Sequence, residues 1–116
     1  MNTTLDTLRE ALRRFAAERD WDQFHSPKNL AMALNVEAGE LLEQFQWLSE
    51  AQSQALSPEQ HQAVAEEIAD VLLYLIRLAD RLGIDPLDAA AQKMVQNARK
   101  YPVDKAKGRA DKYTQL

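Results

Sequence analysis

Four carboxylates stand in two pairs, Glu37 with Glu40 and Glu67 with Asp70. The members of each pair are three residues apart, so on a helix they share one face. Both faces are otherwise apolar: the first carries Leu30, Ala33, Leu34, Leu41 and Leu48, and the second carries Val64, Val71, Tyr74 and Leu78. An unpaired charge taken out of water costs several kcal/mol. The spacing therefore predicts that something positive holds these four groups.

A divalent cation is the simplest candidate, because the surrounding sequence offers no basic side chain. From Asn29 to Ile76 there are eight acids and no Lys or Arg. Ligands that are all oxygen favour a hard ion, Mg²⁺ first and Mn²⁺ second. The alternative is that the carboxylates lie at the edge of the core and pair with Arg or Lys from elsewhere. Glu43 and Glu66 flank the pairs, and we interpret them as outer or solvent-exposed groups.

Basic residues gather in the last part of the chain. From Lys93 to Leu116 there are seven basic residues and two acids. Lys93, Asn97 and Lys100 follow helical spacing and share a face. This segregation predicts an acidic site and a basic one in the same small protein, unless the charges are separated by chance on solvated faces.

The elements that must position these residues are helices. Thr3 or Thr4 can cap a first helix whose apolar face is Leu5, Leu8, Leu12 and Phe15. After a loop at 19–25, Ser26-Pro27 starts a second helix that is expected to run to about Trp47. Residues 49–57 are a connection. Ser57 and Gln60 form a capping box for a third helix ending near Leu82 and Gly83. Asp85-Pro86 starts a fourth helix that ends before Tyr101-Pro102.

We therefore predict an all-α fold, a four-helix bundle in a single domain 1–116, with residues 103–116 as a flexible basic tail. The second and third helices each carry a second apolar stripe, which on the third is Ile68, Leu72, Leu75, Ala79 and Leu82. A helix with two apolar sides is central or packs on another subunit. This pattern predicts an oligomer.

Composition narrows the function classes. The chain has no cysteine, so disulfide and thiolate metal sites are excluded, and a reduced, cytoplasmic setting is expected. Glu-x-x-His pairs are missing, which argues against di-iron chemistry. No apolar run reaches the roughly 18 residues needed to span a membrane. We expect neither a membrane nor a nucleic acid as partner.

The motifs Glu37-Ala-Gly-Glu40 and Glu67-Ile-Ala-Asp70 resemble the E-x-x-E and E-x-x-D signature of the all-α NTP pyrophosphohydrolases. The stretches 19–30, Phe45-Gln46-Trp47 and 97–102 resemble its MazG-like and dCTP pyrophosphatase branch. The resemblance covers about residues 8–113. It implies hydrolysis of a (deoxy)nucleoside triphosphate, dCTP or a modified dCTP, to the monophosphate and pyrophosphate.

The same resemblance implies roles for individual residues. Glu37, Glu40, Glu67 and Asp70 would bind Mg²⁺, and Glu40 is the candidate to activate water. Candidates for the nucleoside pocket are Trp21, His25, Asn29, Trp47 and Tyr74, although Trp21 and Phe24 could equally be ordinary core residues. Candidates for the phosphates are Lys28, Lys93, Asn97, Lys100, Tyr101 and Lys105.

The resemblance also implies a homo-oligomer, most simply a tetramer built as a dimer of dimers, with composite sites. Three alternatives remain open: a dUTPase, a phosphoribosyl-ATP pyrophosphohydrolase, or a non-catalytic helical interaction domain. Pyrophosphate release from a nucleotide panel separates the enzymes from the binding module.

Overall fold

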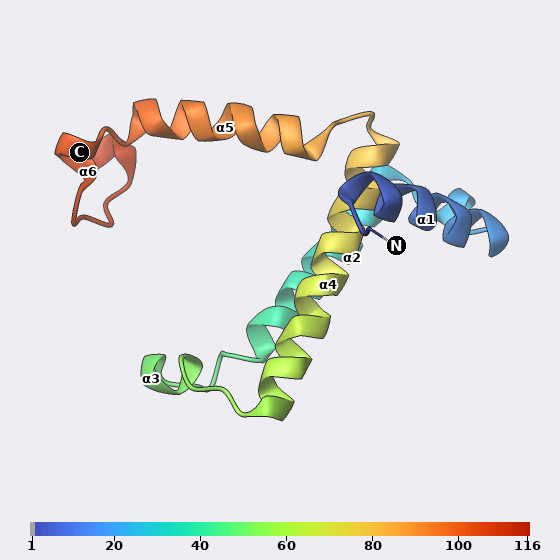
Figure 1. Ribbon diagram of the computed structural model, residues 1–116, viewed down its shortest axis with the longest axis horizontal. Helices are drawn as coiled ribbons and strands as arrows, with labels where there is room; N and C mark the ends of the chain where they lie inside the picture. The colour runs from blue at the N-terminus through green and yellow to red at the C-terminus, as the bar shows by residue number, and fades with distance from the viewer. Residues whose placement is uncertain (1) are drawn as a thin grey trace. The chain divides into compact units, whose positions relative to one another are not determined.

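The structure, a computed structural model, describes residues 2–116, and these form helices and turns without a strand among them (Figure 1). The all-α prediction is confirmed. The longer helices are α1 (Leu5–Glu18), α2 (Pro27–Glu43), α4 (Pro58–Arg81) and α5 (Pro86–Lys100). The short elements are η1 (Asp22–Phe24), α3 (Glu50–Ser53), α6 (Val103–Ala106) and η2 (Tyr113–Gln115). The chain divides into two compact units, Met1–Gly83 and Ile84–Leu116.

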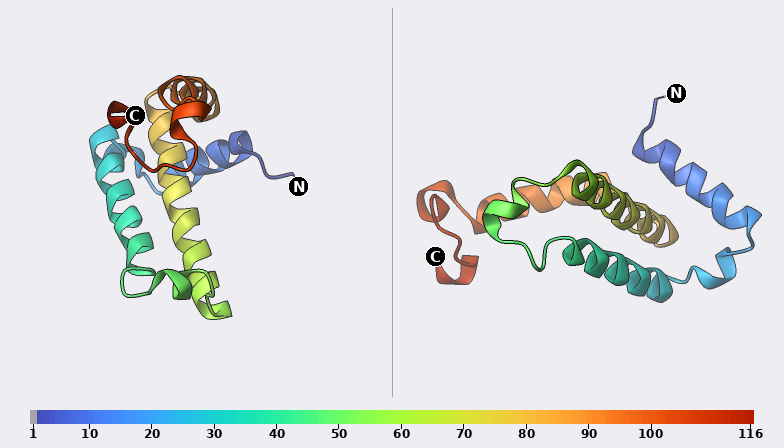
Figure 2. Two further views of the ribbon diagram at one scale, coloured as in Figure 1. Left: turned by 90° about the vertical axis from the view of Figure 1, so that its left-hand side faces the viewer. Right: turned by 90° about the horizontal axis from the view of Figure 1, so that it is seen from below.

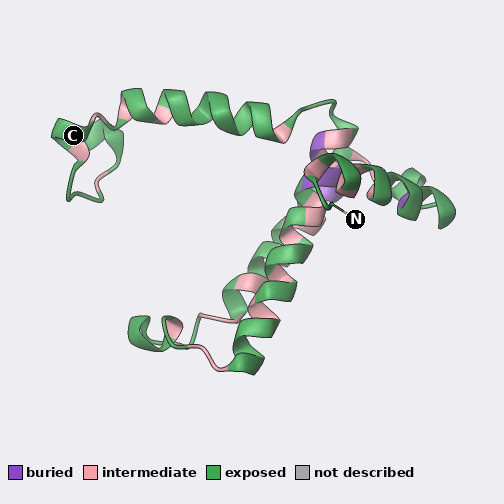
Figure 3. Cartoon of the chain, in the orientation of Figure 1, coloured by how far each residue is buried: buried purple, intermediate pink, exposed green. Residues whose placement is uncertain are grey.

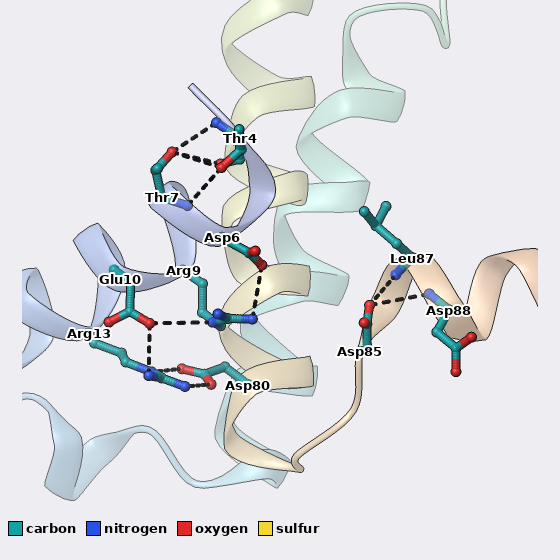
Figure 4. Close-up of polar contacts among 10 residues, drawn as sticks. All are labelled: Thr4, Asp6, Thr7, Arg9, Glu10, Arg13, Asp80, Asp85, Leu87 and Asp88. Carbon is teal, nitrogen blue, oxygen red and sulfur yellow. Dashed lines mark hydrogen bonds and ion pairs between the residues drawn. The ribbon is translucent and has the colours of Figure 1, made fainter. Parts of the chain in front are cut away.

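The predicted helix starts are confirmed by their caps. Thr4 closes a capping box with Thr7 at the start of α1, and Ser57 closes one with Gln60 at the start of α4. Ser26 accepts a hydrogen bond from the Asn29 amide at the start of α2. Asp85 accepts from the Leu87 and Asp88 amides at the start of α5 (Figure 4). These side chains satisfy amides that the first helical turn leaves unpaired.

Two predicted boundaries were wrong. The second helix was expected to reach Trp47, but α2 ends at Glu43 and is succeeded by tight turns, in which the Phe45 amide bonds to Leu42 and the Leu48 amide to Phe45. The connection at 49–57 contains the short helix α3, which Ser49 caps in a capping box with Gln52. The Ser49-x-x-Gln52 spacing repeats that of Ser57 and Gln60, so the signal was present in the sequence.

In the first unit, α4 packs against both α2 and α1. Helices α2 and α4 run side by side in opposite directions (Figure 2). The buried apolar residues are Ala16 of α1, Leu30 of α2, and Ile76 and Ala79 of α4, and Arg77 of α4 is buried among the polar ones. Three of these residues belong to the C-terminal part of α4, where Figure 3 shows buried surface. This small core fixes the end of α4 that lies beyond Asp70.

The link from α1 into η1 depends on one unusual backbone conformation. Asp20 has a φ of 56°, in the left-handed region that Asp tolerates better than most residues. The turn is closed by the Trp21 amide, which donates to the Ala16 carbonyl over 2.9 Å. Chain reversal at this point brings Trp21 and η1 back toward the helices.

The second unit consists of α5, α6 and η2. Residues 103–116, predicted to be a tail, contain the last two of these. The Tyr101 and Tyr113 rings meet edge to face with centroids 6.0 Å apart, and Lys100 Nζ lies 4.8 Å from the centre of the Tyr113 ring. These contacts join the end of α5 to η2.

Candidate active site

The carboxylates that the sequence placed in pairs come together between α2 and α4. One oxygen from each of Glu37, Glu67 and Asp70 lies within 4.8 Å of the others. Glu37 and Glu67 are half-buried, and Asp70 is exposed. Because α2 and α4 run side by side in opposite directions, a pair on one helix faces a pair on the other.

The electrostatics of this cluster are unfavourable when it is fully ionised. Burial, followed by the neighbouring Glu40 carboxyl and the charges of Asp70 and Glu67, raises the pKa of Glu37 to about 7. Burial and then the charge of Glu40 also raise the pKa of Glu67. Glu40 is therefore close enough to act on both groups. Like charges brought together in a partly desolvated place favour the protonated form.

Two oxygens of the cluster lack hydrogen-bond partners in the part of the chain that the structure describes. Oε2 of Glu37 and Oε2 of Glu67 are buried, and neither has a hydrogen-bond partner among residues 2–116. Buried polar atoms are nearly always satisfied in folded proteins. Burial and other acids account for the raised pKa values of Glu37 and Glu67, and no cation of the described residues is among these causes. An all-oxygen set with two unsatisfied acceptors fits a hard divalent cation such as Mg²⁺. The residues present thus suit the ion that the sequence predicted.

A cavity of about 220 Å³ adjoins the cluster and shares Asp70 with it. Its walls come from α1, the η1 region and α4: Leu12, Phe15, Ala16, Trp21, His25, Asp70, Leu73, Tyr74 and Arg77. The Trp21 ring packs edge to face on Phe15, with centroids 5.6 Å apart, and lies 6.2 Å from the His25 ring. An apolar, aromatic-lined cavity with a few polar groups is the usual form of a small-molecule site.

Three predicted pocket residues, Trp21, His25 and Tyr74, line this cavity. Leu12 and Phe15, which the sequence assigned to the core face of the first helix, line it as well. Arg77 was missed by sequence reasoning. It is the one cation in the apolar stretch from Val71 to Ala79, and this isolation could have singled it out.

The remaining candidates of the first unit lie outside the cavity wall. Lys28 is exposed in the first turn of α2. The side-chain amide of Asn29 donates to the Phe24 carbonyl over 3.0 Å, so it helps to hold η1. Trp47 lies in the turns after α2 with 86% of its surface exposed. Its role in binding stays a prediction.

The basic candidates belong to the second unit. Lys93, Asn97 and Lys100 lie on α5, Tyr101 ends that helix, and Lys105 lies on α6. Asn97 and Lys100 are half-buried, whereas Lys93, Tyr101 and Lys105 are exposed. Lys100 and Tyr101 both contact the Tyr113 ring. Their assignment to the phosphates stays a prediction.

Comparison with known proteins places this geometry in a family. The model of the MazG-like family matches residues 32–116. The chain is 49% identical to dCTP pyrophosphatase 1 of Rattus norvegicus and 46% identical to that of Homo sapiens. Each match spans 115 residues, 97% of this chain and 68% of the relative.

A solved structure agrees. The crystal structure of a pyrophosphatase from Archaeoglobus fulgidus superposes with a TM-score of 0.81 at 42% sequence identity. The match covers 88% of this chain and 95% of the archaeal one. No helix among residues 2–116 combines the length and the apolar character that crossing a membrane requires. The chain belongs to the MazG-like family and is a nucleoside triphosphate pyrophosphohydrolase.

Proposed function

We propose that this protein hydrolyses dCTP, or a dCTP modified on its base, to the nucleoside monophosphate and pyrophosphate, with Mg²⁺ as its cofactor. The observation that carries the proposal is the carboxylate cluster with its two unsatisfied buried oxygens, next to an aromatic cavity that shares Asp70. The names of the rat and human relatives support the choice of base.

Glu37, Glu40, Glu67 and Asp70 would hold the ion. A bound Mg²⁺ would neutralise charge on the triphosphate and lower the pKa of a water molecule. Glu40 is our candidate for orienting that water and accepting its proton, since it acts electrostatically on both Glu37 and Glu67. The low-dielectric surroundings that raise the pKa of Glu37 also strengthen each carboxylate's attraction for a cation.

The nucleoside belongs in the cavity. Trp21 offers an aromatic face, Tyr74 lies one turn beyond Asp70 on α4, and His25 offers a ring nitrogen. The volume of about 220 Å³ can accommodate a nucleobase. We assign the triphosphate to Lys93, Asn97, Lys100, Tyr101 and Lys105, together with Lys28, because cationic side chains are the usual ligands of phosphate.

The active form is proposed to be a homo-oligomer, most simply a tetramer, in which residues 1–116 act as one nucleotide pyrophosphohydrolase domain. Ile68, Leu72 and Leu75 of α4 are between 42% and 53% exposed. A symmetric partner would cover such apolar surface without requiring new sequence.

A panel of nucleotides tests the substrate. The purified protein is incubated with Mg²⁺ and each canonical dNTP, each NTP, dUTP and 5-methyl-dCTP, and pyrophosphate release is measured. We expect the highest kcat/KM with dCTP or its 5-methyl form. A preference for dUTP or a purine nucleotide would contradict the proposed base, and no release from any nucleotide would contradict the proposed reaction.

A further inference from the structure

A buried arginine that the proposed reaction does not use lies against the His25 ring. Arg77 is 5% exposed, and its Nε lies 3.2 Å from Nδ1 of His25. The Nε of arginine carries a hydrogen and has no lone pair to offer, so Nδ1 of His25 must be the acceptor. In a neutral imidazole the ring proton then resides on Nε2.

We propose that Arg77 is a positioning residue that holds His25 as its Nε2–H tautomer, so that the ring presents a hydrogen-bond donor to the base of the bound nucleotide. The identity of that ligand rests on the proposed function. The tautomer itself does not, because it is set by contacts within the chain.

The guanidinium is held on its other side by two carboxylates. Nη2 of Arg77 is paired with Asp22 of η1, and Nη1 lies 3.7 Å from Asp80 Oδ2. Asp80 is itself paired with Arg13 of α1. The ion pairs to Asp22 and Asp80 fix the orientation of the planar guanidinium, and this orientation keeps its Nε–H directed at His25. Lysine, with one ammonium group, could not keep all three partners.

The ring is neutral near pH 7. Burial, and then the charge of Arg77, lower the pKa of His25, with Arg81 acting in the same direction and Asp22 against it. With Nδ1 already accepting from Arg77, Nε2–H is the one polar group that the ring has left. No hydrogen bond from residues 2–116 reaches Nε2, and the ring lines the cavity.

A donor fixed in this place selects for an acceptor on the base. Cytosine has two acceptors on its pairing edge, N3 and O2, whereas N3 of thymine and uracil carries a hydrogen. Thymine and uracil also carry acceptors, at O2 and O4, so the discrimination would operate at N3, where a donor from His25 would meet their N3–H instead of a lone pair. Arg77, although it also lines the cavity, would therefore act on specificity through His25.

Nitrogen-15 NMR of the histidine rings in the nucleotide-free protein tests the tautomer. The chain has two histidines, and the exposed His61 serves as an internal reference. At pH 7.5 we expect His25 with a protonated Nε2 and an unprotonated Nδ1. Arg77→Met should move both His25 nitrogen signals and leave His61 unchanged. Arg81→Met is the matched control, since it removes a nearby charge but no contact to His25, and its Nδ1 should stay unprotonated.

Kinetics with dCTP test the role. We expect Arg77→Met to raise KM by about three- to tenfold, the usual worth of one hydrogen bond, with kcat within twofold. The same substitution should have no further effect in a His25→Ala background, because Arg77 acts through His25. Asp22→Asn, which removes the ion pair on the more exposed side of the Arg77 guanidinium, should also raise KM.

Three results would overturn the proposal: an Nδ1–H or doubly protonated His25 in the wild type at pH 7.5, unchanged His25 nitrogen signals in Arg77→Met, or a loss of kcat that persists without His25. The wild-type spectrum needs no variant, so the tautomer is decided even if Arg77→Met does not fold. If the wild type releases no pyrophosphate from dCTP, the proposed substrate fails while the tautomer result still stands.

Discussion

Arg13 of α1 and Asp80 of α4 form a two-pronged ion pair (Figure 4). Nε of Arg13 lies 2.7 Å from Oδ2 of Asp80, and Nη2 bonds to Oδ1. The aspartate side chain is 10% exposed and also faces Arg77. The Asp80 carboxylate thus links α1 to Arg77 in the cavity wall, and its loss should affect both the packing of α1 and the position of Arg77.

The hydrogen bond from Arg13 lowers the pKa of Asp80 below its ordinary value of 3.8. A lowered folded-state pKa means that the pair's contribution is complete above the unfolded value and is lost as the pH falls through the folded one. Asp80→Asn should therefore lower the Tm by several degrees at pH 7, and this loss should shrink as the pH is lowered below 3.8.

The control for this prediction is Asp6→Asn, which removes an ion pair to Arg9 within α1. The Asp6 side chain is 78% exposed, so its pair should contribute almost nothing. Equal Tm losses in the two variants, or a loss in Asp80→Asn that does not depend on pH, would show that the Arg13 pair is not what Asp80 contributes.

The raised pKa of Glu37 predicts a pH dependence of the opposite sign. The folded protein keeps a proton on Glu37 up to about pH 7, whereas the unfolded chain loses it near 4.5. Between these values the folded state binds more protons, so stability falls as the pH rises. Thermal unfolding in EDTA should show this fall in the wild type, and Glu37→Gln should reduce it. A steeper fall in Glu37→Gln would contradict this prediction.

Asp70 is expected to be required for turnover. Because it belongs both to the carboxylate cluster and to the cavity wall, Asp70→Asn should lower kcat/KM more than about 100-fold, beyond the usual effect of losing an outer-sphere group. Glu66→Gln, an exposed acid on the same helix, is the matched control and should retain activity. Circular dichroism checks that the helices survive. Full activity of Asp70→Asn, or of the wild type in excess EDTA, would remove the metal from the proposed reaction.

Trp47→Ala should separate binding from stability. Because Trp47 is 86% exposed, the free energy of unfolding of the isolated chain should hardly change. Stacking of an aromatic ring on a base is worth about 1–3 kcal/mol, so a base contact predicts at least about tenfold weaker nucleotide binding by calorimetry. Unchanged affinity together with a lower assembled mass would assign Trp47 to a subunit interface instead.

Sedimentation at micromolar concentration tests the proposed assembly. We expect a mass well above the 13.2 kDa of one chain, and most simply four times that mass. Leu72→Glu, on the exposed stripe of α4, should lower it by placing a charge in an apolar interface. A catalytically active wild-type monomer at this concentration would mean that the stripe is covered within one chain.

Helix starts were predictable from the sequence because they are local. Ser26-Pro27, Ser57-Pro58 and Asp85-Pro86 each combine an acceptor side chain with a fixed φ, and each begins a helix as expected. Helix ends depend more on the conformation of the next residues in the chain, and α2 ended four residues early because tight turns lead into the Ser49 cap.

The meeting of Glu37 with Glu67 and Asp70 was predictable from spacing on two faces. The contact of Arg77 with His25 was not, because 52 residues separate them and no periodic pattern relates a loop to a helix.

The three proline-started helices also bear on how the molecule folds. Each start is specified by neighbouring residues, so short stretches of these helices can form before any distant part of the chain arrives. The acidic pairs of α2 and α4 meet only when those two helices dock. Repulsion between them therefore arises only in the docked state, and a divalent ion that binds the docked state but not the open chain shifts the balance toward the folded protein by mass action. In cells, the abundance of this enzyme would then depend on the supply of the same ion that its proposed reaction requires.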